Sequence, residues 1–343
     1  ENEHTHRDST QMADWFEQLF GFREGDFDWT QAQFALRDGV LSSRHSEQKY
    51  VAGQFSTPTI SELRDQVTES GTPSVLSHVV IGDALELHAS CDNAGDMFQV
   101  ASQFNALEFG SPEVTPEDGL SGYAYDMTQG PACSLAAAAG TVVRNYLVNL
   151  DNQVGQSRQV QINNLATLES VLPGGPYWRV KNGYIESEEY KLLELANELQ
   201  KHDRDVLTGS VRIGIQHQTQ VTFANRFEVL SPPHLVSQSF CSAVSCAYSK
   251  IASNLWEHLA TLVLEAAYEG TLLAAAIEKA KGTGTGRVWL TFIGGGVFGN
   301  RHSWIKSAIE KSLARTKNLG LEVKICHFRE LQTPYKDIVI PHG

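Results

Sequence analysis

The stretch RVWLTFIGGGVFGNRHSWIKSAIEKSL, residues 287–313, predicts a strand, a glycine-rich turn and a helix in immediate succession. The run 288–293 is rich in β-branched and aromatic residues, which is typical of a buried strand. Glycines follow at 294–296 and at Gly299, and apolar residues recur at helical spacing from Ser303. In this geometry backbone N–H groups and a helix N-terminus face one point, which favours an anion such as phosphate. The same glycines are also typical of an ordinary tight turn, so the rest of the sequence is needed to distinguish an anion-binding loop from a structural turn.

The composition excludes some classes of partner. Of 343 residues, 41% are hydrophobic and 20% are charged, which is ordinary for a globular protein of one large domain or two modest ones. The net charge of −13 argues against nucleic acid or an anionic membrane as a general partner. The longest apolar run, 259–276, is interrupted by Glu265 and Glu269, so it predicts a buried helix instead of a membrane span. The oligomeric state is left open.

Cysteine and histidine spacing predicts neither a disulfide framework nor a metal site. The five cysteines form no CxxC pair and lie in apolar surroundings, which favours free, buried thiols in the cytoplasm or another reducing compartment. The sequence starts at Glu1, and a cleaved targeting peptide is compatible with that start. The twelve histidines show no HExxH and no paired Cys/His spacing, so we expect no metal and no cofactor.

The order of predicted elements defines the fold class. Strands alternate with helices along most of the chain, which predicts an α/β protein with a sheet between two helical layers. We expect residues 1–76 to form an N-terminal extension packed on a core of residues 77–343, with an insertion at about 150–235. Polar residues at 42–55 predict a loop within the extension.

Two helix starts are marked in the sequence. Thr59, with Glu62 three residues later, has the spacing of a capping box. The loop TQGP, residues 128–131, opens a predicted helix over 132–148 whose small residues give it one closely packable face. This helix start also aims backbone donors outward, so the chain contains two glycine-bearing loops that enter helices.

The order of these pieces resembles the macrodomain fold, the ADP-ribose-binding family. A macrodomain strand that ends in Gly-Asp is similar to residues 81–84, and a strand that ends in Asn-Ala-Ala-Asn is partly matched by residues 103–106. Its first phosphate loop corresponds to 128–133, and its second, Gly-x-Gly-x-Phe/Tyr-Gly, is similar to 294–300. The resemblance covers roughly residues 77–330 and implies a macrodomain-like mixed sheet.

Three departures make this a divergent likeness. The first loop carries Gln129-Gly130-Pro131 where the family has a run of glycines. The segment between Asn105 and that loop is long, and the segment between the two main helices is longer than a minimal macrodomain needs.

The resemblance implies a ligand site for ADP-ribose or a related adenine nucleotide. The residues that it assigns to the ligand are Asp83, Ala84, Thr128, Gln129, Gly130, Gly294, Gly295, Gly296, Val297, Phe298, Gly299 and Asn300. Asp83 would accept a hydrogen bond from the adenine amino group, the glycine N–H groups would bind the diphosphate, and Phe298 would line the ribose pocket. Asp83 and Phe298 also have a structural explanation: Asp83 is typical of a Gly-Asp turn, and Phe298 is typical of an aromatic side chain packed in the hydrophobic core.

Hydrolysis at the anomeric carbon would need a positioned water molecule and an acid or base. Asp126, just before the first loop, is the candidate for that role, and Asn105 would orient the distal ribose or the water. An Asn at a strand end can equally bond its own backbone. We therefore predict a protein that binds ADP-ribose or a related nucleotide derivative and hydrolyses it or its conjugate.

The sequence also bears on three other functions. A non-catalytic nucleotide-binding module would need no acid or base. A thiol hydrolase would use Cys133 or Cys241 with a histidine, although apolar neighbours favour inert burial of both thiols. A dinucleotide oxidoreductase is excluded because GTGTG, residues 282–286, precedes a predicted strand, whereas Rossmann glycines follow one.

Overall fold

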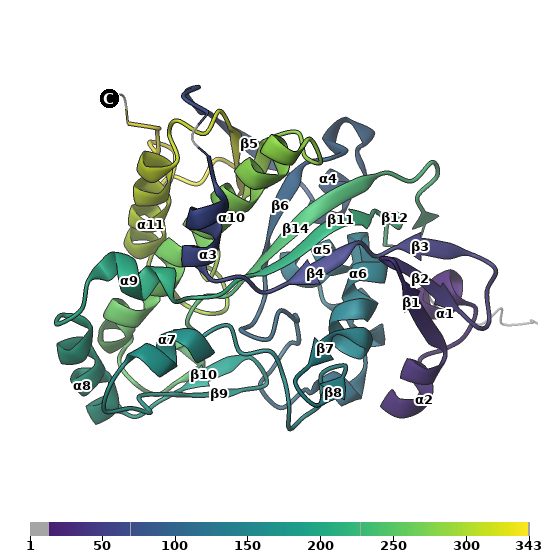
Figure 1. The fold of residues 1–343 in the computed structure, drawn as a ribbon, viewed down its shortest axis with the longest axis horizontal. Helices are drawn as coiled ribbons and strands as arrows, with labels where there is room; N and C mark the ends of the chain where they lie inside the picture. The colour runs from purple at the N-terminus through teal and green to yellow at the C-terminus, as the bar shows by residue number, and fades with distance from the viewer. Residues whose placement is uncertain (1–13, 69, 227, 342–343) are drawn as a thin grey trace, which may run out of the picture.

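A mixed seven-stranded β-sheet forms the centre of the computed structural model, which describes residues 14–68, 70–226 and 228–341 (Figure 1). The strands lie in the order β4-β11-β14-β6-β15-β16-β5. Those from β14 to β5 are parallel, and β11 is antiparallel to both of its neighbours. The strand bounds are Gln54–Ser56 (β4), Val75–Ile81 (β5), Met97–Ala101 (β6), Gly214–Gln220 (β11), Leu235–Cys241 (β14), Arg287–Leu290 (β15) and Glu322–Phe328 (β16).

Helices cover both faces of this sheet. Gln99 of β6 donates its side-chain amide to Thr271 of α10 (Glu257–Lys281). Its neighbour Phe98 stacks instead on His88 of α4 (Ala84–Ala89), with ring centroids 3.9 Å apart. Because successive side chains of a strand point to opposite faces, α10 and α4 lie on opposite sides of the sheet. The predicted three-layer α/β/α arrangement around a mixed sheet is confirmed.

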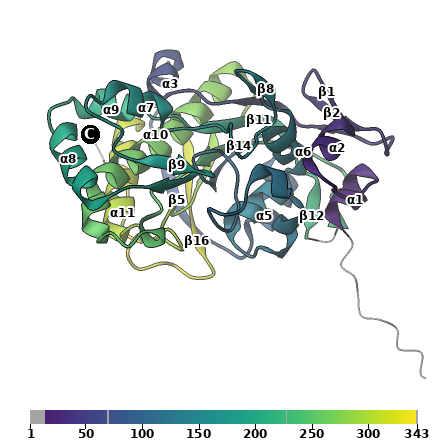
Figure 2. The ribbon, with the colours of Figure 1, turned by 90° about the horizontal axis from the view of Figure 1, so that it is seen from below.

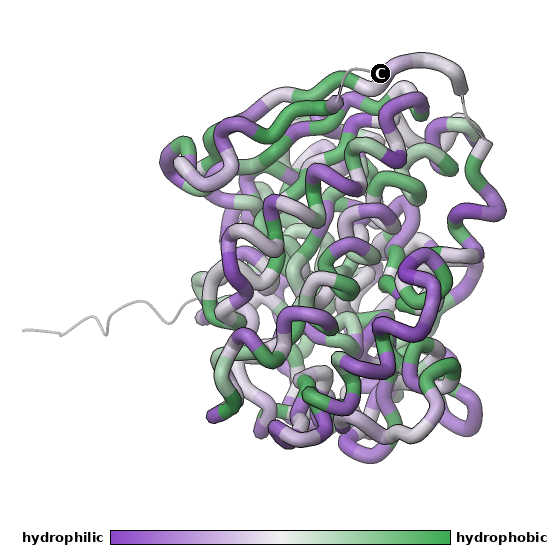
Figure 3. The backbone as a smooth tube through the Cα atoms, turned by 90° about the vertical axis from the view of Figure 1, so that its left-hand side faces the viewer, coloured by the Kyte–Doolittle hydropathy of each residue, from purple (hydrophilic) through white to green (hydrophobic). Residues whose placement is uncertain are grey.

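The remaining helices flank these two. Those that contact α10 are α3 (Ile60–Gln66), α8 (Glu189–Leu199), α9 (Arg204–Gly209) and α11 (His302–Arg315). On the other face lie α4 (Ala84–Ala89), α5 (Gln129–Ala136) and α6 (Ala138–Val142), and α7 (Ala166–Val171) contacts α9. Figure 3 shows hydrophilic and hydrophobic residues alternating along the helices that face the viewer, as expected for helices with one buried side.

Short single turns connect these elements. The 3₁₀ turns are Cys91–Asn93 (η1), Pro116–Asp118 (η2), Ser121–Tyr125 (η3), Cys246–Tyr248 (η5) and Ser253–Trp256 (η6). The small hairpins are β7 (Asn149–Leu150) with β8 (Gln153–Val154), β9 (Arg179–Lys181) with β10 (Tyr184–Glu186), and β12 (Phe223–Asn225) with β13 (Glu228–Val229).

The N-terminal elements form an aromatic cluster against α5 and α6. They are α1 (Trp15–Phe20), α2 (Phe27–Ala32), β1 (Phe34–Arg37), β2 (Val40–Ser43) and β3 (Lys49–Val51), and Figure 2 shows them at the end of the molecule away from α8 and α11. The loop predicted at 42–55 is wrong, because this segment holds β3 and enters β4, which pairs with the distant strand β11. The boundary at residue 76 stays a prediction. The capping box of Thr59 and Glu62 at the start of α3 is confirmed.

The helix predicted over 132–148 is divided into three pieces. Helix α5 ends at Ala136, α6 begins at Ala138, and Val143–Leu147 (η4) is a π-helical turn. Thr222 causes the first break: its N–H donates to the carbonyl of Ala136, and its hydroxyl accepts from the N–H of Ala138. The backbone and the side chain of Thr222 therefore replace two of the helix's own hydrogen bonds.

The long helix α10 is a core helix. The segment 253–281 is long and apolar enough to cross a membrane by composition, but 94% of its apolar window is buried inside the protein. This burial agrees with the predicted buried helix, because a core helix passes the same test of length and hydropathy. Three of its glutamates are buried and paired with side chains of other elements: Glu265 with Arg204, Glu269 with Arg64 in a bidentate contact, and Glu278 with His217.

Candidate functional site

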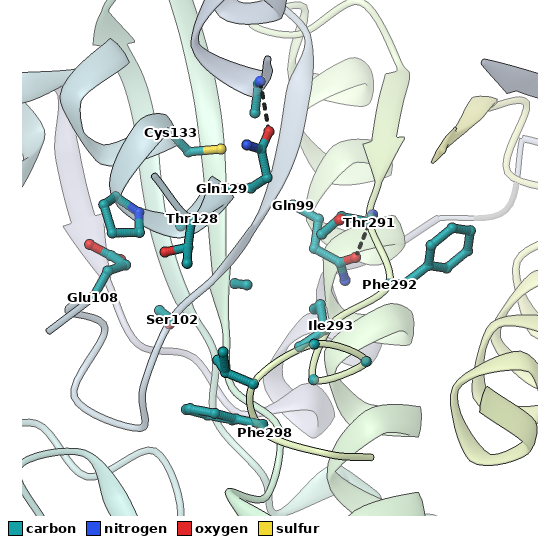
Figure 4. Close-up of a pocket in the computed structure, with 18 of the residues that line it drawn as sticks. Gln99, Ser102, Glu108, Thr128, Gln129, Cys133, Thr291, Phe292, Ile293 and Phe298 are labelled. Atoms are coloured by element: carbon teal, nitrogen blue, oxygen red, sulfur yellow. Dashed lines mark hydrogen bonds between the residues drawn. The ribbon is translucent and has the colours of Figure 1, made fainter. Parts of the chain in front are cut away.

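A cavity of about 580 Å³ opens at the carboxyl ends of the parallel strands. Its floor includes residues at or next to the ends of β5, β6, β15 and β16, among them Ile81, Ala101, Thr291 and Phe328. This edge of a parallel sheet is where α/β proteins usually hold ligands. Figure 4 shows Glu108, Thr128 and Cys133 on one side of the cavity and Gln99, Thr291 and Ile293 on the other.

The structure brings the two glycine-bearing loops to this one cavity. Of the residues assigned from the sequence, those that line it are Ala84, Asp126, Thr128, Gln129, Gly130, Gly294, Gly295, Gly296, Val297 and Phe298. The residues assigned from the sequence that do not line it are Asp83, Asn105, Gly299 and Asn300. The two loops belong to segments far apart in the chain, so their convergence is a property of the fold.

The first loop presents a helix start with no side chain capping it. Thr128 is the N-cap of α5, and its own N–H and hydroxyl both donate to Asp126 Oδ1, at 2.8 and 2.6 Å. Gln129 Oε1 accepts the N–H of Ala84 at 2.8 Å, which ties α5 to α4 (Figure 4). A Cβ at Gly130 would lie 2.4 Å from the carbonyl oxygen of Ala101, so only glycine fits there. The uncapped helix start favours negative charge in the cavity.

The second loop is a closed turn that leaves three backbone N–H groups without an acceptor among the described residues. Gly294 has a φ of 75°, which favours glycine, and its carbonyl accepts the N–H of Asn300 at 2.9 Å. The side-chain amide of Asn300 also donates to the carbonyl of Val244, so Asn300 fixes the turn from below. Within the described part of the chain, the backbone N–H groups of 296–298 have no hydrogen-bond acceptor. These donors are available to a ligand.

No lysine or arginine is among the described residues that line the cavity. An anion in this cavity would therefore be held by backbone dipoles and neutral donors, as in other glycine-rich phosphate loops. Among the residues the structure describes, no three His, Cys, Asp or Glu side chains form a group that could hold a metal ion.

Two assigned residues have structural roles away from the cavity. Asp83 caps α4 by accepting the N–H of Leu85 at 2.9 Å, and its other oxygen faces Arg226 at 4.0 Å. The expected catalytic role of Asn105 does not fit its position: it is fully buried, donates to Gln161 at 2.9 Å and accepts the N–H of Leu107 at 3.1 Å. Both ends of its amide are thus used within the protein, because Asn105 closes a strand-end turn.

Asp126 lies at the mouth of the cavity, partly exposed to solvent. One of its carboxylate oxygens is occupied by the two hydrogen bonds from Thr128. This arrangement is a local turn of the kind that Asp makes with the residue two positions later. Asp126 can reach a ligand at the mouth, but its position does not bury the carboxyl group or isolate it from water.

Glu108 is a cavity-lining residue that the sequence did not indicate. Its side chain is 2% exposed, Oε2 accepts the hydroxyl of Ser134 at 2.6 Å, and Oε1 has no partner among the described residues. The guanidinium of Arg144 lies 3.9 Å from Oε2 and donates to the same Ser134 hydroxyl at 3.1 Å. Burial raises the pKa of the Glu108 carboxyl to about 7, although the Arg144 charge and the Ser134 hydrogen bond oppose that rise.

The backbone on either side of Glu108 is held in place. Its own N–H donates to the hydroxyl of Tyr123 at 2.8 Å. The next residue, Phe109, is fastened by Gln103, whose amide accepts the N–H of Phe109 and donates to its carbonyl. Tyr184 donates its hydroxyl to that carbonyl as well, at 2.6 Å. The carboxyl group is therefore attached to a rigid segment.

The cysteines do not form a thiol site. Cys133 lines the cavity, but burial and the nearby Glu108 charge hold the pKa of its thiol well above the ordinary value. Cys241 is buried against Ser239 and Thr271, and burial raises the pKa of its thiol too. A thiol held protonated is a poor nucleophile, so the structure gives no support to the thiol hydrolase.

Aromatic side chains and the C-terminal segment complete the walls. Phe298 packs against Tyr184 and Tyr248, with ring centroids 5.5 and 5.7 Å apart. Tyr335 stacks on Phe292 at 3.7 Å and its hydroxyl lies 2.7 Å from His302 Nδ1. Residues 329–341 are anchored by two histidines of the sheet: His327 Nδ1 accepts the N–H of Gln332, and His78 Nε2 lies 3.0 Å from the carbonyl of Ile338.

Comparisons with known proteins find overall likeness only at the level of structure. No protein-family model matches the chain, and no curated protein matches it. Poly(ADP-ribose) glycohydrolase from Deinococcus radiodurans in complex with ADP-ribose is similar at a TM-score of 0.44 and 11% identity, covering 83% of this chain and 91% of that one. Poly(ADP-ribose) glycohydrolase from Thermomonospora curvata is similar at a TM-score of 0.43 and 15% sequence identity, and the match covers 82% of each chain.

Proposed function

We propose that the cavity binds ADP-ribose or a related adenine nucleotide derivative and that the protein hydrolyses this ligand or its conjugate. The observation that carries the proposal is the convergence of two glycine-bearing loops on one cavity at the carboxyl edge of the sheet. One loop supplies an uncapped helix start and the other supplies the unpaired N–H groups of 296–298. A diphosphate is an anion with enough acceptor oxygens to use both at once.

The rest of the cavity suits the remainder of such a ligand. Apolar side chains from α4, β6 and β15, including Leu87, Phe98 and Trp289, offer a surface for a planar base. Glu108 and Asp126 offer carboxyl groups on the other side of the first loop. A base at one end, a diphosphate in the middle and a ribose beside a carboxyl group would place the sugar where hydrolysis can occur.

Calorimetric titration with ADP-ribose tests the binding. Gly296→Glu places a carboxylate beside the free N–H groups without a clash, because a Cβ at Gly296 meets nothing within 4 Å. We expect the wild type to bind ADP-ribose more tightly than AMP. In Gly296→Glu we expect ADP-ribose affinity to fall at least about tenfold, equivalent to about 1.4 kcal/mol, by repulsion of the diphosphate.

The matched control is Gly122→Glu, an exposed glycine of η3 that also has open space around its Cβ position and does not line the cavity. It changes the net charge equally and should bind as the wild type does. Equal weakening in both variants would mean that the effect is general electrostatics. No ADP-ribose binding by the folded wild type would contradict the proposed ligand.

The alternative function, a nucleotide-binding module without activity, uses the same cavity. Release of product from ADP-ribosyl conjugates separates the two. Binding without turnover on every conjugate would favour the module, because a binding site needs no group that moves protons.

A further inference from the structure

We propose that Glu108 is the general base of this cavity and that Ser134 and Arg144 position it. The proposal rests on the proposed function, because it assigns the proton-transfer step of that hydrolysis. It replaces Asp126, which the sequence indicated for this role. Glu108 lines the cavity, whereas its partners lie behind it, on α5 and on the π-helical turn.

The two carboxylate oxygens of Glu108 have different surroundings. Oε2 is anchored by the Ser134 hydroxyl at 2.6 Å, and Oε1 has no hydrogen-bond donor among the described residues. Buried polar atoms are nearly always paired, so a buried carboxylate oxygen beside a cavity without a protein partner indicates a ligand or a water molecule as its partner. Oε2 is thus anchored within the protein, and Oε1 is the oxygen of this cavity-lining residue that has no partner among the described residues.

A purely structural ion pair would look different. The Glu108 and Arg144 charges are 3.9 Å apart and have the Ser134 hydroxyl between them, instead of the direct bidentate contact that stabilises buried pairs. Arg144 is itself fully buried, held by the carbonyl of Ala106 and by the ring of Phe240 at 3.6 Å. The fold thus holds the Arg144 guanidinium next to the carboxyl group although burying this charge costs desolvation free energy.

The charged and titratable groups around Glu108 come from three elements. Arg144 lies on η4, Tyr123 on η3 and Cys133 on α5. Burial dominates their combined effect and raises the pKa of Glu108 to about 7. A carboxyl group with a pKa near neutrality is a stronger base than an ordinary carboxylate and is still substantially ionised at pH 7.

The step balances with water as the only co-reactant. Oε1 accepts a proton from a water molecule whose oxygen forms a bond to the anomeric carbon of the bound ribosyl group. The bond from that carbon to the leaving atom breaks, and the leaving atom keeps the electron pair and takes a proton from solvent. Glu108 then returns its proton to solvent, so the enzyme is unchanged.

Turnover of Glu108→Gln is the main test. Release of ADP-ribose is measured from poly(ADP-ribose) and from peptides ADP-ribosylated on serine, arginine or glutamate. We expect kcat to fall about 10²- to 10⁴-fold while the Kd for ADP-ribose stays within a few-fold of wild type. Glu113→Gln, an exposed glutamate of the same connecting segment, is the matched control and should keep full activity. Glu108→Gln with near wild-type kcat would overturn the proposal.

Ser134→Ala tests the positioning role by its pH profile. Loss of the hydrogen bond to Oε2 removes an interaction that favours the charged carboxylate, so the midpoint of the pH–rate profile should move to higher pH. A merely structural role for Ser134 would lower activity without moving the midpoint. An unmoved midpoint would therefore contradict this part of the proposal.

Two further outcomes separate this inference from the proposed ligand. Infrared difference spectra between wild type and Glu108→Gln, recorded without ligand across pH 5 to 9, report directly whether the carboxyl group ionises near neutral pH. If the carboxyl band titrates near pH 7 but ADP-ribose does not bind, the proposed ligand is refuted and the raised pKa of Glu108 stands. ADP-ribose binding with no turnover of any probe would refute the general-base role and keep the ligand.

Discussion

At the scale of single residues, Glu108 links the stability of the fold to pH. Its carboxyl group has an ordinary pKa of 4.5, and burial raises it to about 7 in the folded chain. Below pH 4.5 the group is protonated in both states. As the pH rises from 4.5 to 7, the unfolded chain releases this proton while the folded chain keeps it, so the free energy of unfolding falls.

Urea unfolding of wild type and Glu108→Gln at pH 4, 5.5 and 8 tests this coupling. We expect the stability of the wild type relative to the variant to fall by about 3 kcal/mol between pH 4 and pH 8, because the glutamine carries no charge that burial can penalise. The control Glu113→Gln should follow the wild type across the range. Parallel pH dependences of wild type and Glu108→Gln would contradict the raised pKa.

The residues of the site differ in how well sequence could predict them. The loop residues Gly130 and Gly294 were found because a glycine-rich turn before a helix is a local pattern. Glu108 was missed because nothing in NALEFG distinguishes it, and its partners Ser134 and Arg144 lie on later helices. Asn105 has the residue type expected of a site but a position in which the turn uses both ends of its amide.

At the scale of elements, local signals were sufficient for β15, α11 and β16, whose strand and helix patterns lie in one contiguous stretch. Local signals failed to predict elements whose structure depends on hydrogen bonds from a distant part of the chain. The strand β4 exists because β11 supplies its hydrogen bonds, and the break between α5 and α6 exists because Thr222 inserts between Ala136 and Ala138. A continuous helix would carry Arg144 away from Glu108, so this break helps to build the site.

Thr222→Val is expected to weaken both the fold and the site. It leaves the N–H of Ala138 buried without its acceptor, which costs about 1–3 kcal/mol, and it loosens the helix pieces that carry Ser134 and Arg144. Chemical unfolding and the pH–rate profile measure the two effects. Thr208→Val is the control, because its hydroxyl donates to the Arg204 carbonyl one helical turn earlier in α9. Equal losses of stability and activity in the two variants would contradict the prediction that Thr222 supports the site.

At the scale of the whole molecule, an acidic protein is proposed to bind an anion. The net charge is −13, and among the described residues no lysine or arginine lines the cavity. Long-range repulsion between protein and ligand is screened by salt, whereas the dipoles of nearby N–H groups act at short range. The net negative charge of the protein therefore slows association with an anionic ligand, and the N–H groups of the two loops would bind the ligand at short range.

We expect ADP-ribose affinity to stay level or to rise, by up to a few-fold, when salt increases from about 20 to 200 mM, because screening reduces the repulsion. Calorimetry at several salt concentrations, with a neutral salt and constant pH, measures this. A steep loss of affinity with salt would show instead that lysine or arginine side chains bind the phosphates.

The walls of the cavity come from segments that are far apart in the chain, from Ile81 on β5 to Tyr335 beyond β16. The last of these pieces, residues 329–341, is held in part by His78 and His327, which are neighbours on the paired strands β5 and β16. The complete cavity therefore exists only in the folded sheet, because its walls come from strands that lie far apart in the sequence and pair only on folding. Any ligand of this cavity would therefore protect the folded sheet against unfolding, because the separated segments offer no such cavity.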